Sequence, residues 1–266
     1  MRFLVSAPEK SASSAGINAL YELSEDLKTL GYNSEIALWT QFHNLRDDDI
    51  LIYPEVVVGN PLHAKNVVRY VLNREGILTG NKMNAGENDF IFAWSKLYYP
   101  SSHANLLKFS IPSFFNDLDT KFALERNIDC TYIGKGSIYK NCPIIPNTLE
   151  INKHNPINKP ALADLLRNTR FLYTYDTLTS IINESILCGA ILIPLHWHPF
   201  SEEEYNQSDY KFPYANLTQH NVIIPLNYVN ERKQYIDNIK NTNLNYLSKL
   251  NEIATQMVQH FKLSSI

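Results

Sequence analysis

The sequence alternates short apolar runs with longer segments that have helical spacing. Apolar residues at positions 17, 20, 23, 27 and 30 recur every three or four residues and predict an amphipathic helix, which Gly31 would end. Strands separated by helices of this length predict βαβ units and a parallel sheet. In the first half we expect strands at 2–6, 35–38, 50–53, 90–94 and 106–109, and a second helix at 64–73 that carries Val67, Val68 and Val71.

A second series of the same kind begins at residues 130–136. Its predicted elements are a helix at 160–166, a strand at 171–173, a helix at 179–188, a strand at 190–195 and a mostly helical end at 228–261. We therefore expect an α/β fold with two Rossmann-like domains, at 1–125 and 126–266. Ligands of such sheets bind at the carboxyl ends of the strands, so we expect the ligand in a cleft that the two domains face.

Composition narrows the class of protein. A net charge of −3 and a pI near 6.2 give no general attraction to nucleic acid, so we expect no nucleic-acid partner. The three cysteines lack metal-ligand spacing, and their odd number favours a reducing compartment over a disulfide framework. We recognise no signal peptide, and no apolar run reaches the roughly 20 residues that span a bilayer. A cytoplasmic protein is the expectation.

The most informative stretch is TRFLYTYDTLTSIINESILCGAILIPL, at 169–195. Its predicted strand delivers Tyr175 and Asp176 to a loop, and a helix begins near Thr179. Unpaired amides and the positive dipole end at a helix start suit a diphosphate. Hydroxyl donors are added there by Thr177, Thr179 and Ser180. Glu184, further into the helix, could accept hydrogen bonds from both hydroxyls of a ribose.

A purely structural interpretation of the same stretch is also open. Asp and Thr are ordinary residues at a helix N-cap, which would account for Asp176 and Thr177. Glu184 would then be a solvated helix residue.

Asp176, seven intervening residues, Glu184 and the run SILCGAILIP resemble the C-terminal signature of GT-B glycosyltransferases, above all the retaining glycosyltransferase family 4 group. The resemblance implies that Glu184 holds the ribose of a nucleotide-sugar donor. It also implies that Asp176, which stands where the family usually has Glu, acts as a catalytic residue near the sugar and phosphates.

Two further segments carry the resemblance. The run SSAGINALYELSEDLKTLGYNSEIAL is similar to the opening of these enzymes, which implies that a loop with Ser13, Ser14 and Gly16 approaches the donor or acceptor. A tight helix entry would explain the same residues. TYIGKG, at 131–136, resembles the strand that opens the C-terminal domain, so Lys135 and Gly134 would face the diphosphate. The alternative is a solvated lysine in a glycine turn.

Other candidates come from the residues alone. Glu55 follows a predicted strand and could contact the acceptor or assist its deprotonation, although a carboxylate at a strand end is more often structural. His196 and His198 lie on one face of an extended segment and could form half a metal site. Because no third ligand is convincing, we predict no metal. The sequence has no P-loop, GxGxxG or GxSxG motif, which weakens kinase, dehydrogenase and hydrolase interpretations.

The resemblance implies a GT-B-like fold whose C-terminal helix crosses back to the first domain. It implies sugar transfer from a nucleotide-sugar donor to a hydroxyl of a glycan or lipid-linked acceptor, in bacterial lipopolysaccharide or capsule synthesis. Neither metal nor cofactor is expected, since preorganised amides, hydroxyls and Lys135 would stabilise the departing diphosphate. Peripheral contact with the inner membrane face fits this setting. The alternative is a noncatalytic nucleotide-sugar-binding module or a subunit of a larger transferase.

Overall fold

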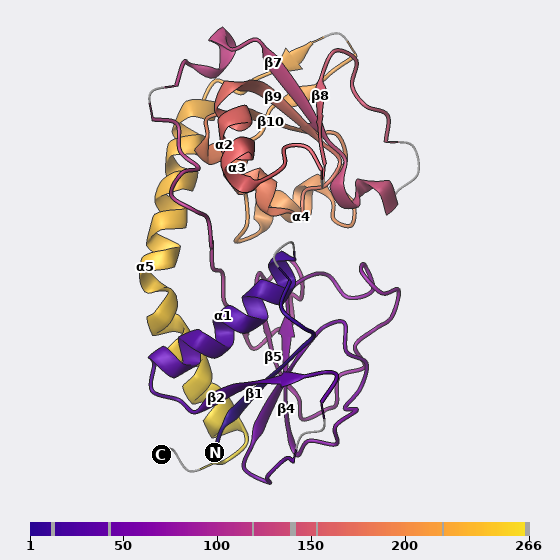
Figure 1. Ribbon diagram of the computed structural model, residues 1–266, viewed down its shortest axis with the longest axis vertical. Helices are drawn as coiled ribbons and strands as arrows, with labels where there is room; N and C mark the ends of the chain where they lie inside the picture. Colours follow the sequence, from indigo (N-terminus) through magenta and orange to yellow (C-terminus); the bar gives the residue numbers. More distant parts are fainter. Residues whose placement is uncertain are drawn as a thin grey trace. The chain divides into compact units, whose positions relative to one another are not determined.

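The computed structural model describes residues 1–11, 14–41, 44–118, 120–138, 142–152, 154–219 and 221–263. They form two compact units (Figure 1). Unit 1 comprises Met1–Lys108, Ser208–Tyr210 and Asn241–Ile266, and unit 2 comprises Phe109–Gln207 and Lys211–Lys240. The first division thus falls at 108/109, where the sequence suggested 125/126. The reason is that Ala123 packs into a core of unit 2 together with Phe171 and Tyr173.

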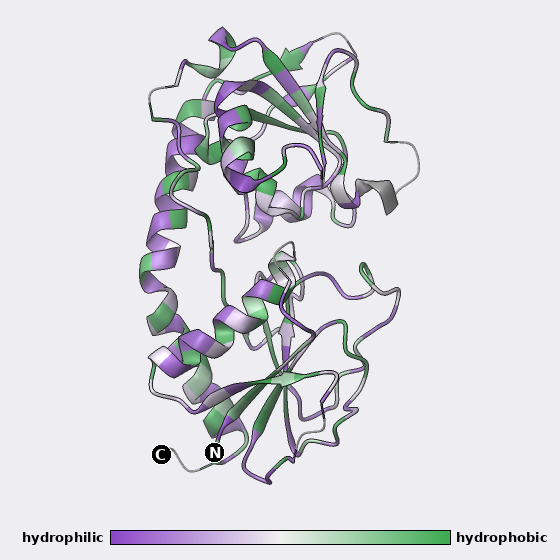
Figure 2. Ribbon diagram, in the orientation of Figure 1, coloured by the Kyte–Doolittle hydropathy of each residue, from purple (hydrophilic) through white to green (hydrophobic). Residues whose placement is uncertain are grey.

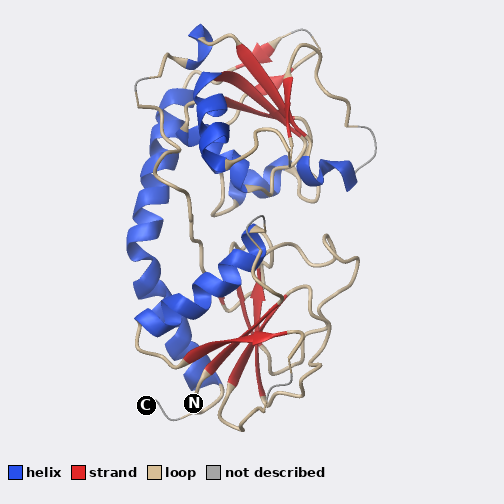
Figure 3. Ribbon diagram, viewed as in Figure 1, coloured by secondary structure: helices blue, strands red, loops and turns tan. Residues whose placement is uncertain are grey.

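Unit 1 contains a six-stranded sheet in the order β2-β1-β3-β4-β5-β6, in which every neighbouring pair is parallel (Figure 3). The strands are β1 (Phe3–Ala7), β2 (Ser34–Leu38), β3 (Ile50–Pro54), β4 (Asn66–Val71), β5 (Phe90–Ala93) and β6 (Ala104–Asn105). β1, β3 and β4 are buried along their whole length. Strands covered on both faces read as continuous apolar runs, and this is why four of the five expected strands are confirmed.

Helices cover one face of this sheet. α1 (Ala15–Thr29) buries Leu20, Leu23 and Leu27, as its apolar stripe predicts, and Gly31 follows it with a φ of +88°. α5 (Tyr228–His260) adds Leu250 and other buried side chains of its last turns to the same core. α5 mixes hydrophilic and hydrophobic residues along its length (Figure 2), as expected of a helix that buries one side.

Two predictions for unit 1 are wrong. The expected helix at 64–73 is the strand β4, because Val67, Val68 and Val71 fit a short strand buried on both faces as well as a helix stripe. The expected strand at 106–109 is replaced by β6, two residues earlier. In addition, β3, β4 and β5 are joined by irregular loops without helices, so among the described residues that connect the strands of this sheet, helix occurs only between β1 and β2. Buried residues of the second core of this unit pack against loop side chains such as Leu45 and Leu62.

Unit 2 contains a four-stranded parallel sheet in the order β10-β9-β7-β8, and a two-stranded antiparallel ribbon. The sheet strands are β7 (Ile128–Tyr132), β8 (Leu149–Ile151), β9 (Thr169–Thr174) and β10 (Ile191–Pro194), and the ribbon is β11 (Asn216–Leu217) with β12 (Val222–Ile223). The helices are α2 (Lys159–Asn168), α3 (Ser180–Leu187) and α4 (Glu202–Gln207), with short 3₁₀ turns η1 (Ala123–Glu125) and η2 (Gly134–Ile138). The predictions for α2, β9, α3, β10 and α5 are confirmed to within a few residues.

Arg126 lies where two helices of unit 2 end. Its guanidinium donates to the carbonyls of Leu166, Thr169 and Cys188, which end α2 and α3. A cation near helix C-termini is favourable because the last carbonyls lack partners within the helix. In the described part of the chain, no helix combines the length and apolar character needed to cross a membrane.

Candidate functional site

The candidate site lies in unit 2, where the turn after β7 meets the loop after β9. Gly134 has a φ of +52°, and a Cβ there would lie 2.5 Å from the Tyr132 ring and 2.6 Å from Oδ2 of Asp176. A Cβ on Gly136 would lie 2.5 Å from Cβ of Tyr175. The two glycines therefore let the first turn sit directly on the second loop, at the carboxyl edge of the sheet.

Asp176 ties these two segments together. Its Oδ2 accepts a hydrogen bond from the backbone N–H of Lys135 at 2.9 Å and pairs with Nζ of Lys135 at 3.2 Å. Its Oδ1 accepts from the N–H of Leu178 at 3.0 Å, and Nζ of Lys135 also donates to the carbonyl of Leu178. Asp176 is buried, so its carboxylate is occupied within the protein. Lys135 therefore contacts the loop after β9 through both its backbone and its side chain. It is not a solvated turn residue.

Glu184 and Lys159 form a second ion pair. Nζ of Lys159, at the start of α2, lies 2.5 Å from Oε1 of Glu184 on α3. The side chain of Glu184 is only 4% exposed, which excludes the solvated alternative. Its other oxygen, Oε2, is buried and meets no hydrogen-bond donor among the described residues. An unsatisfied buried acceptor costs about 1–3 kcal/mol, and native proteins contain few of them.

Tyr132, at the end of β7, contacts the start of α3. Its hydroxyl lies 3.5 Å from Oγ1 of Thr179. Burial raises the pKa of Tyr132, and the nearby charges of Asp176 and Glu184 raise it further, so the phenol stays a proton donor. Thr179 is the N-cap of α3, and in the described chain its side chain makes no capping hydrogen bond. The start of α3, with exposed Ser180, thus keeps amide donors that the cap does not satisfy.

Two predicted donor-binding residues help to build the loop. Thr177 is fully buried, and its hydroxyl has no hydrogen-bond partner within the described segments. Its carbonyl accepts a hydrogen bond from the hydroxyl of Tyr205. The hydroxyl of Tyr175 donates to the carbonyl of Pro143 at 2.9 Å. The loop turns the side chain of Thr177 into the interior, and its predicted role toward a donor stays a prediction.

Glu55 lies in unit 1, directly after β3. Its Oε2 accepts a hydrogen bond from the N–H of Leu72 at 2.9 Å, just beyond the end of β4. The side chain is buried, and this burial raises the pKa of Glu55 to about 7, although backbone N–H groups act in the opposite direction. The geometry gives Glu55 a structural contact between two strand ends, and its predicted role toward an acceptor stays a prediction.

The N-terminal loop is described only in part. Ser13 lies outside the described residues. Ser14 is the N-cap of α1, and its hydroxyl accepts a hydrogen bond from the N–H of Ile17 at 3.3 Å. A Cβ on Gly16 would meet open space, so neither crowding nor a positive φ requires glycine at this position. The structure explains Ser14 by helix capping and leaves Gly16 without a packing reason.

His196 and His198 interact with each other. Their ring centroids are 5.9 Å apart, and the backbone N–H of His198 donates to Nδ1 of His196. Across the residues that the structure describes, no group of three or more His, Cys, Asp or Glu side chains is arranged to hold a metal ion.

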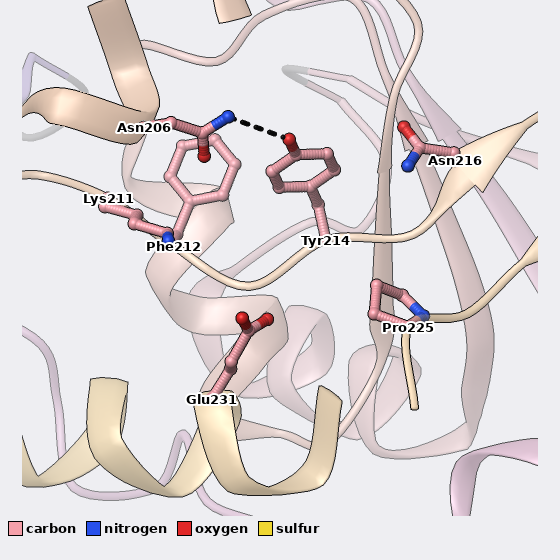
Figure 4. A pocket seen from close by; sticks show the side chains of 7 residues that line it. All are labelled: Asn206, Lys211, Phe212, Tyr214, Asn216, Pro225 and Glu231. Carbon is pink, nitrogen blue, oxygen red and sulfur yellow. Dashed lines mark hydrogen bonds between the residues drawn. The ribbon is translucent and has the colours of Figure 1, made fainter. Parts of the chain in front are cut away.

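Two pockets of unit 2 have linings that include none of the predicted site residues. The first, of about 230 Å³, is drawn in Figure 4, where Asn206 donates a hydrogen bond to the hydroxyl of Tyr214 above Glu231. The second, of about 350 Å³, has apolar walls that include Ile191 and Tyr228. The ion-paired cluster at the strand ends and these hollows are thus separate features of the unit.

Sequence reasoning missed Lys159. One signal was present, since a lysine stands directly before the helix predicted at 160–166, where the dipole disfavours a cation. The partner of that lysine could not be inferred, because Glu184 lies on another helix.

No protein-family model and no curated protein matches this chain. The class that the fold defines is an α/β protein with two parallel-sheet units, compatible with Rossmann-like domains.

Proposed function

We propose that this protein is a glycosyltransferase that uses a nucleotide-sugar donor, and that the nucleotide binds at the carboxyl edge of the sheet in unit 2. The observation that carries the proposal is Oε2 of Glu184, a buried acceptor without a donor among the described residues. A ribose hydroxyl would supply the missing hydrogen bond, and charge-assisted bonds of this kind are about twice as strong as neutral ones.

The surroundings of Glu184 suit the rest of a nucleotide diphosphate. The start of α3 offers amide donors and a positive dipole end, and Ser180 adds an exposed hydroxyl. Two ammonium groups lie beside the carboxylates of this region, since Lys135 pairs with Asp176 and Lys159 pairs with Glu184. Carboxyl edges of parallel sheets are where α/β proteins bind such ligands, which supports the same location.

In the proposed reaction, the bond between the anomeric carbon and the diphosphate oxygen breaks, and a bond to an acceptor hydroxyl oxygen forms. The electron pair of the broken bond stays on the departing diphosphate, and a phosphate oxygen of this leaving group takes up the acceptor proton. Lys135 would then divide its contacts between Asp176 and the growing phosphate charge, which favours the transition state over the ground state. We assign Asp176 to holding the Lys135 turn, because both of its oxygens already accept hydrogen bonds.

The broader setting extends the proposal. The two sheet units and a C-terminal helix that contributes to both are consistent with a GT-B-like arrangement. A glycan or lipid-linked acceptor at the inner membrane face, in lipopolysaccharide or capsule synthesis, belongs to the proposal through the sequence resemblance alone. We leave Glu55 out of the reaction because its carboxylate is enclosed and accepts the N–H of Leu72.

A second candidate is a noncatalytic nucleotide-sugar-binding module. The pairing of Lys135 with Asp176 favours it, since the cation that would stabilise the leaving group already has a counter-charge. Both candidates predict binding, but only an enzyme releases nucleotide.

The test separates these two candidates. Purified full-length chain is incubated with UDP-, GDP-, ADP- and CMP-linked sugars without acceptor, and released nucleotide is measured by chromatography beside a thermal-shift assay. A ligand that binds only the folded protein raises its melting temperature by mass action. Slow release of nucleotide supports the transferase, and stabilisation without release supports the binding module. If none of these nucleotide sugars raises the melting temperature and none releases its nucleotide, both candidates are overturned.

A further inference from the structure

The inference concerns Lys159, and it rests on the function proposed above. Lys159 opens α2, where a cation opposes the helix dipole at a cost of about 0.3–1 kcal/mol. The helix start does not depend on it. Asn158 is the N-cap and accepts a hydrogen bond from the N–H of Ala161 at 2.9 Å, and Pro160 supplies a residue that suits the first turn. The position of this lysine therefore needs an explanation outside its own helix.

Glu184 supplies that explanation. Nζ of Lys159 approaches its Oε1 to 2.5 Å, and the ammonium lies 5.7 Å from the ring centroid of Phe115. In the part of the chain that the structure describes, Lys159 has no other ion-pair or hydrogen-bond partner. The lysine side chain is 52% exposed and the glutamate 4%, so the lysine reaches from the surface to a carboxylate inside. A buried carboxylate without a counter-charge is strongly unfavourable.

The pairing is one-sided. Lys159 occupies Oε1, and Oε2 stays without a donor. A carboxylate is planar, so holding one oxygen by a short ion pair also fixes the direction of the other. Lys159 thus supplies the charge that makes burial of Glu184 tolerable and leaves one acceptor for a ligand. The same carboxylate held by donors on both oxygens would offer a ligand fewer free lone pairs.

We propose that Lys159 is a positioning residue that orients Oε2 of Glu184 toward the vicinal hydroxyls of a ribose. Lys159 itself need not touch the nucleotide. It selects ribonucleotides over analogues that lack these hydroxyls, because its effect passes through the hydrogen bond that only the hydroxyls make.

The experiment is calorimetry on the full-length chain with UDP, GDP, ADP and CDP and with their 2′,3′-dideoxy analogues. Lys159→Met should weaken binding of the ribonucleotide that the wild type prefers by about tenfold, the scale of one hydrogen bond to a charged group. Binding of the dideoxy analogue should stay unchanged. Lys159→Arg keeps the charge and should restore most of the preference. Lys28→Met is the control, because Lys28 also pairs with a carboxylate on a helix, Glu25, but on the surface of α1.

A general structural effect would look different. If Lys159→Met weakened ribonucleotide and dideoxynucleotide equally, or changed neither, the positioning role would be overturned. A double variant that combines Lys159→Met with Glu184→Gln gives a second check. This check does not require Lys159→Met alone to be fully stable. In the Glu184→Gln background, Lys159→Met should cause no further loss of ribose preference, and an undiminished loss would also overturn the role. A wild type that binds none of the four nucleotides overturns the proposed function together with this inference, whereas wild-type binding with an unchanged Lys159→Met variant overturns the inference alone.

Discussion

The two units bury charged groups in different ways. In unit 1, Arg69 is almost completely buried on β4, where it pairs with Asp89 at 2.7 Å and donates to the carbonyls of Val57 and Gly59. In unit 2, Glu184 is buried with one oxygen paired and the other without a donor among the described residues. Buried polar groups are normally satisfied, so an exception points to a ligand. The comparison predicts that the buried charge of Arg69 in unit 1 acts on stability and that the buried charge of Glu184 in unit 2 acts on binding.

Arg69→Met should have the largest effect. It leaves Asp89 and two carbonyls without their donor, and breaking a buried ion pair by removing one partner costs about 3–5 kcal/mol. Urea unfolding measures the loss, and nucleotide affinity should not change if the variant is folded. Lys65→Met is the matched control, since Lys65 and Asp47 form an exposed pair. A loss below about 1 kcal/mol for Arg69→Met would contradict the role assigned to unit 1.

Glu55 gives unit 1 a pH dependence. Burial raises the pKa of Glu55 to about 7 from its ordinary value of 4.5, so the folded state binds more protons between these two pH values. Stability should therefore be greatest near and below pH 4.5 as far as this group is concerned, and it should fall by up to about 3 kcal/mol as pH rises through 7. Glu55→Gln should flatten this fall in urea unfolding between pH 5 and 8, whereas Glu9→Gln, at an exposed position, should not. A variant with the same slope as the wild type would exclude this titration.

Glu184→Gln tests the other half of the comparison. Replacement of the charged acceptor should weaken nucleotide binding by about 1.5–3 kcal/mol, with a cooperative unfolding transition retained. Calorimetry with the preferred nucleotide measures the loss, and circular dichroism checks the fold. Unchanged affinity would show that Oε2 is not the acceptor for the ribose.

Lys135→Ala should have a smaller effect in free energy than the three variants above, and a more specific one. Turnover should fall by about tenfold, or 1.4 kcal/mol, while affinity for the nucleoside diphosphate changes less, because phosphate charge grows as the sugar bond breaks. Thr179→Val should do less, since a neutral hydroxyl is the weaker partner and the helix amides remain. Steady-state kinetics and calorimetry on both variants give the comparison. If Lys135→Ala has the turnover and the affinity of the wild type, the role of this lysine is limited to its ion pair with Asp176.

The spacing of apolar residues predicted most of the helices and strands, because amphipathic helices and buried strands differ in this spacing. The stripe of α1 and the run that becomes β9 are local signals. β4 was misjudged because a strand covered on both faces does not alternate, and three valines there also fit a helix. Nothing local indicated that loops would join β3, β4 and β5.

The candidate site was predictable in part for a related reason. Loops at the ends of β7 and β9 follow from the parallel sheet, so Lys135 and Asp176 could be expected together. The partner of Glu184 lies 25 positions away on another helix, and such a pairing depends on tertiary packing. For the same reason, the sequence could not show that the side chain of Thr177 turns inward, or that Thr179 stands at the N-cap of α3 without a capping hydrogen bond from its side chain.

The division of α5 has a consequence for synthesis on the ribosome. Residues up to Lys240 complete unit 2, whereas Asn241–Ile266 belong to unit 1, where Leu250, Ile253 and Met257 fill the core beside β1 and α1. Domains usually fold in the order in which they emerge, from the N-terminus onward. Here the unit whose translation begins first is the last to receive its complete core. We expect its nascent sheet to keep an apolar face uncovered until residues 246–258, which supply the missing part of the core, have been synthesised.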